Sequence, residues 1–141
     1  MTQDFSAIGL MSGTSMDGID AVLTKFHSNG EDETLSHTFT PYPKPLRKML
    51  FEKLKTFQIS LEEYGELHHF VGEVFAKAAI SCQKQAKQKR KPHQADVIGS
   101  HGQTIFHNPG KKVSLQIGSA QAIAKATGIT TASNFRMADI Y

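Results

Sequence analysis

Two stretches near the N-terminus carry the residue pattern of β-strands. Residues 5–11 form a mostly apolar run that is typical of a buried strand, and apolar and polar residues roughly alternate from Ile19 to Phe26. Because the residues between them are rich in glycine, serine and aspartate, we expect the two strands to form a hairpin. Residues 34–42 predict a third strand, which a cluster of three prolines brings to an end.

The middle of the chain has the periodicity of helices. Apolar residues from Leu46 to Phe57 predict one helix. Ser60 and Glu63 have the spacing of an N-terminal capping box, so a second helix is expected to begin there. It is predicted to reach about Lys89 and to stop before Pro92. Its apolar stripe consists of Leu61, Tyr64, Leu67, His68, Val71, Val74, Phe75, Ala78, Ala79 and Cys82.

The last third of the chain predicts short strands around one helix. We expect strands over 96–100, 113–117 and 129–133, and a helix over 119–127 that Gly128 caps. Three strands followed by helix, strand, helix and strand is the element order of the actin-like, ribonuclease-H-like half domain. The sequence therefore predicts an α/β fold in which helices flank a mixed sheet.

The composition indicates one globular domain without a membrane segment. The 141 residues are 39% hydrophobic, and no apolar run approaches the ~20 residues that span a bilayer. Residues 1–5 lack the basic and apolar regions of a secretory signal, so we expect a cytoplasmic location. The single cysteine, Cys82, excludes an internal disulfide and is expected in the helix core.

The net charge of +3 raises the question of an acidic partner, and much of the positive charge is local. No aromatic residue is interleaved with the cations, as stacking on bases would require. We therefore expect a solvated helix end and no nucleic-acid binding. The cations of this basic run are Lys84, Lys87, Lys89, Arg90 and Lys91.

Residues 12–20 combine glycines, hydroxyls and carboxylates in one turn. Gly13 and Gly18 are expected to take positive φ and to let a ligand approach the backbone, whose successive N–H groups suit an anion. Asp17 and Asp20 suit a hydrated Mg²⁺ or a substrate hydroxyl. Taken alone, the pattern also fits an ordinary tight hairpin turn, and it lacks the lysine of the G-x-x-x-x-G-K-[ST] nucleotide site.

Polar residues follow the strand predicted over 96–100, at a position where ligands usually bind in open α/β sheets. Gln103 and Thr104 are neutral hydrogen-bonding groups that suit sugar hydroxyls. His101 fits three roles, namely a buried hydrogen-bonding residue, a metal ligand and a proton carrier. His107 lies six residues further along an expected loop, without a cysteine or acidic pair at a zinc spacing, so we do not expect a metal held by histidine.

The complete string of residues 9–20 closely resembles the first phosphate loop of the anhydro-N-acetylmuramic acid kinases, a family of the sugar kinase, Hsp70 and actin superfamily. Several motifs in the right order are more specific than any one of them. The resemblance extends from about Ile8 to the last residue and is weaker over 27–94. The other similar segments, in the family's order, are residues 98–109, 114–118, 127–131 and 135–136.

This resemblance implies an ATP-dependent sugar kinase of cell-wall recycling, with ATP and Mg²⁺ as cofactors. Such an enzyme hydrolyses the 1,6-anhydro ring of anhydro-N-acetylmuramic acid and phosphorylates its 6-oxygen, giving N-acetylmuramate 6-phosphate. Asp17 and Asp20 would hold the metal through water. The sugar is expected at His101, Gln103, Thr104 and Arg136. The phosphates of ATP are expected at Gly13, Thr14, Ser15, Met16, Asp17, Gly18, Ile19 and Asp20.

The chain resembles only the N-terminal part of this family. It ends at Tyr141, where the family continues into a nucleotide-binding half with the catalytic base, so residues 1–141 are expected to be a phosphate-loop and sugar-binding half domain without a catalytic residue. Asn134 stands where the family usually has aspartate. We expect the chain alone to be inactive and to form a homodimer, or to dock to the missing half, through an exposed apolar patch. A non-catalytic remnant, or a sugar- or phosphate-binding module that needs a second half, is the alternative.

Overall fold

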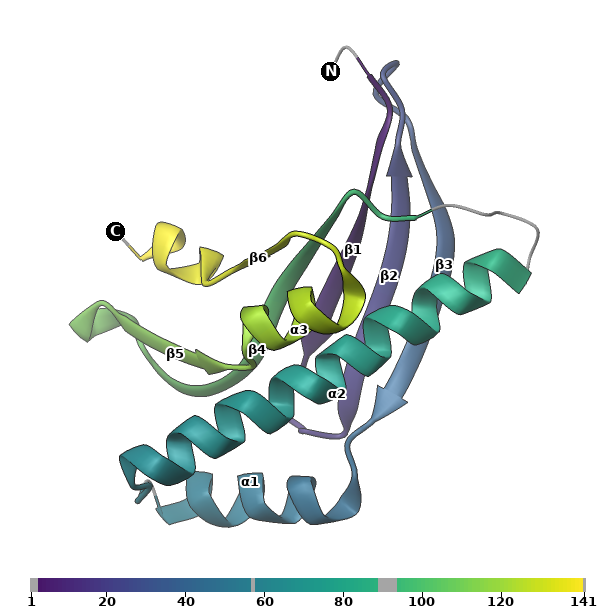
Figure 1. Cartoon of the computed structure of the whole chain (residues 1–141). Helices are drawn as coiled ribbons and strands as arrows, with labels where there is room; N and C mark the ends of the chain where they lie inside the picture. Colours follow the sequence, from purple (N-terminus) through teal and green to yellow (C-terminus); the bar gives the residue numbers. More distant parts are fainter. Residues whose placement is uncertain (1–2, 57, 89–93, 141) are drawn as a thin grey trace.

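The computed structural model describes residues 3–56, 58–88 and 94–140, which form one six-stranded mixed sheet with helices on one face (Figure 1). Predicted and observed strand limits agree within two residues, except for β4. The helices are α1 (Lys44–Thr56), α2 (Leu61–Gln88) and α3 (Ala120–Thr127), with two short 3-10 helices, η1 (Pro109–Lys111) and η2 (Phe135–Asp139). The strands are β1 (Phe5–Ser12), β2 (Gly18–Phe26), β3 (Asp32–Pro41), β4 (Val97–Asn108), β5 (Val113–Ile117) and β6 (Thr131–Ser133).

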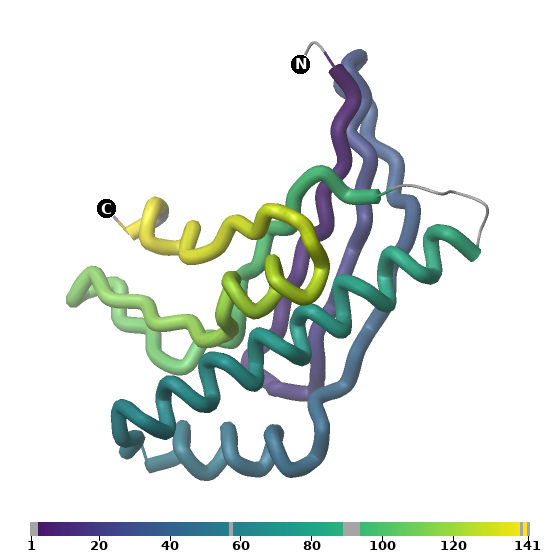
Figure 2. The backbone as a smooth tube through the Cα atoms, viewed as in Figure 1, coloured from purple at the N-terminus to yellow at the C-terminus, as the bar shows by residue number. Residues whose placement is uncertain are grey.

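The sheet has the order β3-β2-β1-β4-β5, and β6 pairs with the first part of β4. β2 is antiparallel to both of its neighbours, whereas β1 and β6 are parallel to β4, with Ile98 opposite both Ile8 and Thr131. From Gln103 onward β4 pairs with β5 in an antiparallel hairpin, and the C-terminal segment lies beside this hairpin (Figure 2). The mixed sheet with flanking helices confirms the predicted α/β fold and is consistent with the actin-like half domain.

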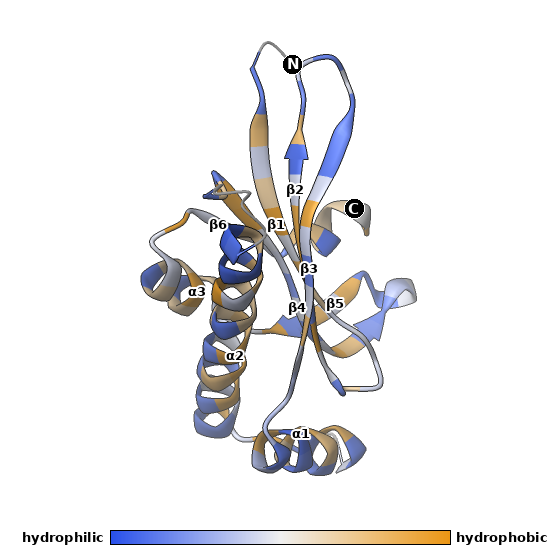
Figure 3. Cartoon of the chain, turned by 90° about the vertical axis from the view of Figure 1, so that its right-hand side faces the viewer, coloured by the Kyte–Doolittle hydropathy of each residue, from blue (hydrophilic) through white to orange (hydrophobic). Residues whose placement is uncertain are grey.

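One hydrophobic core lies between the sheet and helices α2 and α3, which cover the same face (Figure 3). Every second residue of β1, from Ser6 to Ser12, is buried against them. The Cys82 thiol of α2 lies 3.4 Å from Ala21 O of β2, which confirms its prediction as a helix core residue. Since full burial of one aliphatic side chain is worth roughly 1.5–3 kcal/mol, the buried stripe of α2 outweighs its intrinsic helix propensity.

The predicted helix caps are present. Glu63 N donates to Ser60 Oγ (3.1 Å) and Ser60 N donates to Glu63 Oε2 (2.9 Å), the reciprocal bonds of a capping box. The Lys53 ammonium, and then the Ser60 N–H, hold the pKa of Glu63 below its ordinary value. At the end of α3, Gly128 adopts the left-handed conformation (φ 72) and its N–H donates to Ala124 O (2.8 Å).

The fourth strand is much longer than predicted. β4 continues to Asn108, so the expectation that it ends at Ser100 and that residues 101–104 form a loop was wrong. The strand continues because β5, its third pairing partner after β1 and β6, pairs with it beyond a bend. Gly102 forms this bend with a φ of 71, and a Cβ there would lie 2.6 Å from Ile117 O.

Some predictions fall outside the described residues. They concern the end of the second helix near Lys89 and Pro92, and Phe57 of the first helix. Of the basic run, Lys84 and Lys87 lie in the described part of the chain. Over the described ranges, no helix has the length and apolar character needed to cross a membrane.

Gly72 marks a close contact between α2 and the start of α3. A Cβ at this position would lie 2.7 Å from Ser119 N and 2.8 Å from Ser119 O. Gly72→Ala is therefore expected to lower the free energy of unfolding by about 1–3 kcal/mol through overpacking. Urea unfolding monitored by circular dichroism measures this change.

Gly65 on the same helix provides the matched control, because a Cβ there meets nothing within 4 Å. Gly65→Ala is expected to raise the free energy of unfolding by about 0.5–1 kcal/mol, since it removes backbone freedom from the unfolded chain. Destabilisation of similar size by both substitutions would contradict the close helix contact at Gly72.

Candidate functional site

The loop between β1 and β2 is a tight turn. Met16 N donates to Gly13 O (3.2 Å) and closes it. Positive φ falls on Met16 (φ 51), not on Gly13 or Gly18, so the prediction for the two glycines was wrong. The Met16 side chain is buried in the core and anchors this residue, while residues 13–15 remain exposed.

Gly18 has a packing role instead. A Cβ on Gly18 would lie 2.4 Å from Thr40 O and 2.8 Å from Pro41 Cα, so only glycine lets β2 approach the end of β3 this closely. The approach brings Tyr42 N within 3.0 Å of Asp17 O, to which it donates. The loop is thereby fixed to the segment that follows β3.

Four carbonyl oxygens of the loop region are held by the protein. A loop whose carbonyl groups are bound from behind turns N–H groups outward, and outward N–H groups are what an anion requires. The supporting bonds run from Gln103 Nε2 to Gly13 O (3.3 Å), from Arg47 Nε to Met16 O (2.9 Å), from Tyr42 N to Asp17 O (3.0 Å) and from Ser12 Oγ to Gly18 O (2.9 Å).

A buried polar network lies directly behind the loop. Gln103 is 1% exposed, and its Oε1 accepts from Tyr42 Oη (3.4 Å) and lies 2.8 Å from Ser12 Oγ, whose single proton is shared between this oxygen and Gly18 O, while Nε2 donates to Gly13 O. The structure therefore brings the Gln103 amide to the loop between β1 and β2. Burial raises the pKa of Tyr42 to about 12, against a smaller opposing effect of the Ser12 hydroxyl.

The carboxylates of the loop lie at the surface. Asp17 pairs with Arg47, and Asp20 pairs with His37 at 3.0 Å. Their side chains are 56% and 54% exposed, so water reaches both carboxylates. Within the part of the chain that the structure describes, no cluster of three or more His, Cys, Asp or Glu side chains could hold a metal ion.

The other predicted sugar-binding residues lie on β4 and the C-terminal segment. Arg136 Nη1 donates to Thr104 Oγ1 (3.4 Å), which joins η2 to β4. The His101 ring lies 6.3 Å from the Phe135 ring, centroid to centroid. The structure thus brings His101, Thr104 and Arg136 to one region, although His101 and Thr104 belong to a strand and not to a loop.

A polar cavity of about 350 Å³ opens between β4, β5, α2 and the start of α3. His101 and Asn134 both line it. Asn134 has a left-handed backbone (φ 60), a conformation that asparagine tolerates better than most residues. Other residues of the lining are Tyr64, His68, Ser100 and Gln116.

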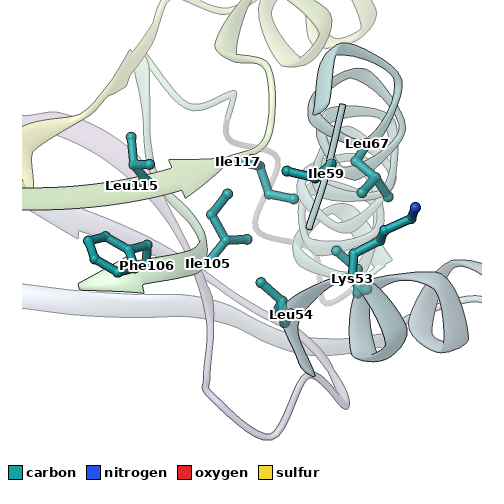
Figure 4. A pocket seen from close by; sticks show the side chains of 9 residues that line it. Lys53, Leu54, Ile59, Leu67, Ile105, Phe106, Leu115 and Ile117 are labelled. Atoms are coloured by element: carbon teal, nitrogen blue, oxygen red, sulfur yellow. The ribbon is translucent and has the colours of Figure 1, made fainter. Parts of the chain in front are cut away.

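A second cavity, of about 310 Å³, is apolar (Figure 4). Its lining comes from the β4–β5 hairpin on one side and from α1, α2 and their connection on the other. The Lys53 ammonium at its rim pairs with Glu63. Such a surface does not suit phosphate or sugar hydroxyls. The labelled apolar side chains are Leu54, Ile59, Leu67, Ile105, Phe106, Leu115 and Ile117.

The sequence analysis missed Tyr42 and Arg47. Tyr42 contacts the loop through its N–H and its hydroxyl, and Arg47 through its guanidinium. The sequence does contain an indication of both residues. The prolines around Tyr42 end the third strand, so the segment that carries Tyr42 and Arg47 leaves the sheet beside the hairpin loop. The pairing partners themselves depend on a close approach that Gly18 permits and that the sequence pattern does not reveal.

The chain is similar to one known family over nearly its whole length. A family model described as anhydro-N-acetylmuramic acid kinase matches residues 5–141. Proteins named anhydro-N-acetylmuramic acid kinase are 46% identical over 143 residues in Synechocystis sp. and 41% identical over 144 residues in Caldanaerobacter subterraneus subsp. tengcongensis. The matches cover 94% of this chain but 35% and 36% of these relatives, so the chain spans about a third of their length.

The buried Tyr42 hydroxyl predicts a loss of stability at alkaline pH. Between pH 10 and about 12, the unfolded chain releases the Tyr42 proton and the folded chain retains it. The free energy of unfolding should therefore fall through this range, by up to about 2–3 kcal/mol from this group. Tyr42→Phe should remove that part of the fall, as measured by urea unfolding across the range.

Tyr64→Phe is the control, because Tyr64 is only partly buried and stands outside the network. Its pH dependence should match that of the unmodified chain. If the free energy of unfolding of the Tyr42→Phe variant falls as steeply at alkaline pH as that of the unmodified chain, the Tyr42 hydroxyl is not the cause of the fall.

Proposed function

The chain belongs to the anhydro-N-acetylmuramic acid kinase family, and from this premise we propose that it forms the phosphate-binding and sugar-binding part of an ATP-dependent kinase of that amino sugar. The family match over residues 5–141 carries the proposal. The loop at residues 13–17, with carbonyl oxygens held from behind, supports it.

The proposed reaction joins hydrolysis and phosphoryl transfer at one oxygen. Water adds to C1 of the sugar and releases a proton, the C1–O6 bond of the anhydro ring breaks, and O6 takes the γ-phosphoryl group of ATP. ADP is the leaving group, and the sugar product is N-acetylmuramate 6-phosphate. Because ATP is a substrate, the proposal also places the protein in the cytoplasm.

The loop would bind the phosphates of ATP through the N–H groups and hydroxyls of its exposed residues 13–15. Gln103 and Tyr42 are buried behind the loop, so its shape is fixed before a ligand arrives. Donors that need no rearrangement stabilise developing charge most effectively. Arg47 pairs with Asp17 and thereby offsets a negative charge that would repel phosphate.

Mg²⁺ fits the oxygen donors that the loop offers. Asp17 and Asp20 are exposed carboxylates, and such groups hold a hydrated Mg²⁺ through its water ligands. A bound Mg²⁺ would neutralise charge on the β- and γ-phosphates. Arg47 would remain beside Asp17 and offset its charge in the absence of the ion.

The sugar would bind next to the loop, at His101, Thr104 and Arg136. The Arg136–Thr104 hydrogen bond already orders two of these groups toward each other. Gln103 would not bind the sugar, unlike His101, Thr104 and Arg136. It would support the phosphate loop from behind. One strand, β4, would thus supply both a sugar-binding side chain and a support of the loop.

The complete reaction is proposed for a protein that also contains the C-terminal sequence of the relatives, of which this chain spans about a third. No residue of this chain is assigned as the catalytic base. We therefore expect no ADP release from the 141-residue chain alone with Mg-ATP and anhydro-N-acetylmuramic acid.

The test is an ADP-release assay on a fusion of this chain to the C-terminal two-thirds of the Synechocystis relative. The fusion is expected to turn over, and the chain alone is not. Ser15→Ala in the fusion should lower kcat/KM by about 10–100-fold, because it removes a donor to phosphate. Ser28→Ala, in the exposed turn that follows β2, is the matched control and should leave kcat/KM unchanged.

An inactive but folded fusion that still binds the sugar would favour the alternative, a non-catalytic sugar-binding module. Equal loss of activity with Ser15→Ala and Ser28→Ala would contradict a specific role of the loop. ADP release by the chain alone would show that it contains a base that we have not assigned.

A further inference from the structure

The lining of the polar cavity contains no Asp, Glu, Lys or Arg side chain, as far as the structure describes the chain. It lies where β4 bends at Gly102, with β5 on one side and the start of α3 on the other. Its volume of about 350 Å³ is at the small end of the range for ligand pockets. The cavity therefore fits one uncharged substituent or a small ring.

Two buried polar atoms in this lining have no hydrogen-bond partner. They are Ser100 Oγ and Gln116 Oε1, and Thr38 Oγ1 on β3 is the third such atom among the described residues. Ser100 is 1% exposed. An unpaired buried polar group costs roughly 1–3 kcal/mol, so two of them beside one cavity require an explanation.

Ser100 Oγ and Gln116 Oε1 require different hydrogen-bond partners. Gln116 Nε2 donates to Ser114 Oγ (2.5 Å). This bond orients the amide and leaves Oε1 as an acceptor without a donor. The Ser100 hydroxyl has a proton to donate. Both atoms are shielded from solvent, so a ligand reaches them only after their side chains rotate, and for Gln116 this rotation replaces the hydrogen bond to Ser114.

The start of α3 adds further donors. The first N–H groups of a helix have no acceptor within the helix, and Ala120 and Gln121 both line the cavity. The N–H groups just before them are occupied, because Gly118 N donates to His68 Nδ1 (3.3 Å) and Ser119 N donates to His68 O (2.9 Å).

His68 of α2 adds no fixed positive charge to the cavity lining. Burial lowers the pKa of His68, and its neighbour His69 lowers it further, so the ring is neutral at pH 7. The Tyr64 ring stacks on His68 at 5.9 Å and closes this side of the cavity. No Lys or Arg side chain lines the described cavity to pair with an anion, and the Gln116 Oε1 acceptor would repel one.

We propose that this cavity binds a neutral secondary amide, namely the acetamido group of the amino-sugar substrate. The amide N–H would donate to Gln116 Oε1, and the amide carbonyl would accept from the Ser100 hydroxyl and from the start of α3. The acetyl methyl group would lie against Ile117 and Ala120. This inference rests on the proposed function, since it names the part of that substrate which the cavity selects.

The first test is isothermal titration calorimetry of the 141-residue chain with three sugars. They are anhydro-N-acetylmuramic acid, its de-N-acetylated amine, and the anhydro-N-acetylglucosamine that lacks the lactyl carboxylate. Loss of the acetyl group should weaken binding about tenfold or more, as expected for two hydrogen bonds. Loss of the carboxylate should change the affinity by less than about threefold.

Equal affinity for the acetylated sugar and the amine would overturn the acetamido assignment and leave the kinase proposal intact. A large loss on removal of the carboxylate alone would mean that the cavity takes the lactyl group, and would also overturn it. Absence of binding by all three sugars overturns the assignment for this chain, whereas the kinase proposal depends separately on ADP release by the fusion.

Ser100→Ala separates ligand binding from a structural role. Removal of an unpaired buried hydroxyl should leave the melting temperature unchanged or raise it, while the affinity for the acetylated sugar falls about three- to tenfold. The amine, which lacks the carbonyl partner, should bind Ser100→Ala and the unmodified chain equally.

Thr38→Val is the matched control, because it also removes an unpaired buried hydroxyl but lies on β3, outside the cavity. It should keep the melting temperature at or above that of the unmodified chain and leave sugar affinity unchanged. Unaltered affinity in Ser100→Ala, or an equal loss in Thr38→Val, would overturn the proposal.

Discussion

Strands β1 and β4 lie side by side in parallel, with Gly9 opposite Gly99, and Ser6 N donates to Asp96 Oδ2 (2.7 Å) where the pairing begins. A parallel pair cannot be joined by a tight turn, so the chain must cross over between the two strands. The crossover here contains α1 and α2, and α2 covers the face of the sheet that the crossover reaches. The core, the position of the β1–β2 loop and the bend of β4 all follow from this one pairing.

Because the two strands run in the same direction, the end of β1 meets the middle of β4, where Ser12 lies opposite Gln103. Gln103 has β5 on its other side, since it pairs with Ile117. One residue therefore contacts the loop, the main sheet and the hairpin. The polar cavity lies on the helix side of the same bend, and residues of β4 contribute to both sites.

Local patterns predicted the local features of this fold. The β1–β2 hairpin, the capping box at Ser60 and the left-handed Gly128 depend on neighbours a few residues apart, and the sequence reveals such neighbours directly. The family motifs singled out residues 12–20 and 101–104 as candidate site residues but did not reveal their conformations. β4 continues past Ser100 because β5 pairs with it across the bend at Gly102, a contact that polar residues in a row do not reveal.

The same limit applies to the loop. Glycine was expected to carry the positive φ, but the burial of the Met16 side chain decides the backbone conformation there. Arg47 and Tyr42 reach the loop only after β3 has paired with β2, and Ser100 and Gln116 become neighbours of one cavity only through the β4–β5 hairpin. Each of these depends on tertiary contacts that residue types alone do not specify.

The distance along the chain between the loop and its support also sets an order of events during synthesis. Gln103 lies 90 residues after Gly13, whose carbonyl oxygen it holds. At about 5–20 residues per second, a ribosome needs roughly 5–20 s to pass from one to the other. In that interval the loop has emerged without its buried support, so a newly made chain does not hold the loop in its native conformation until β4 has left the exit tunnel.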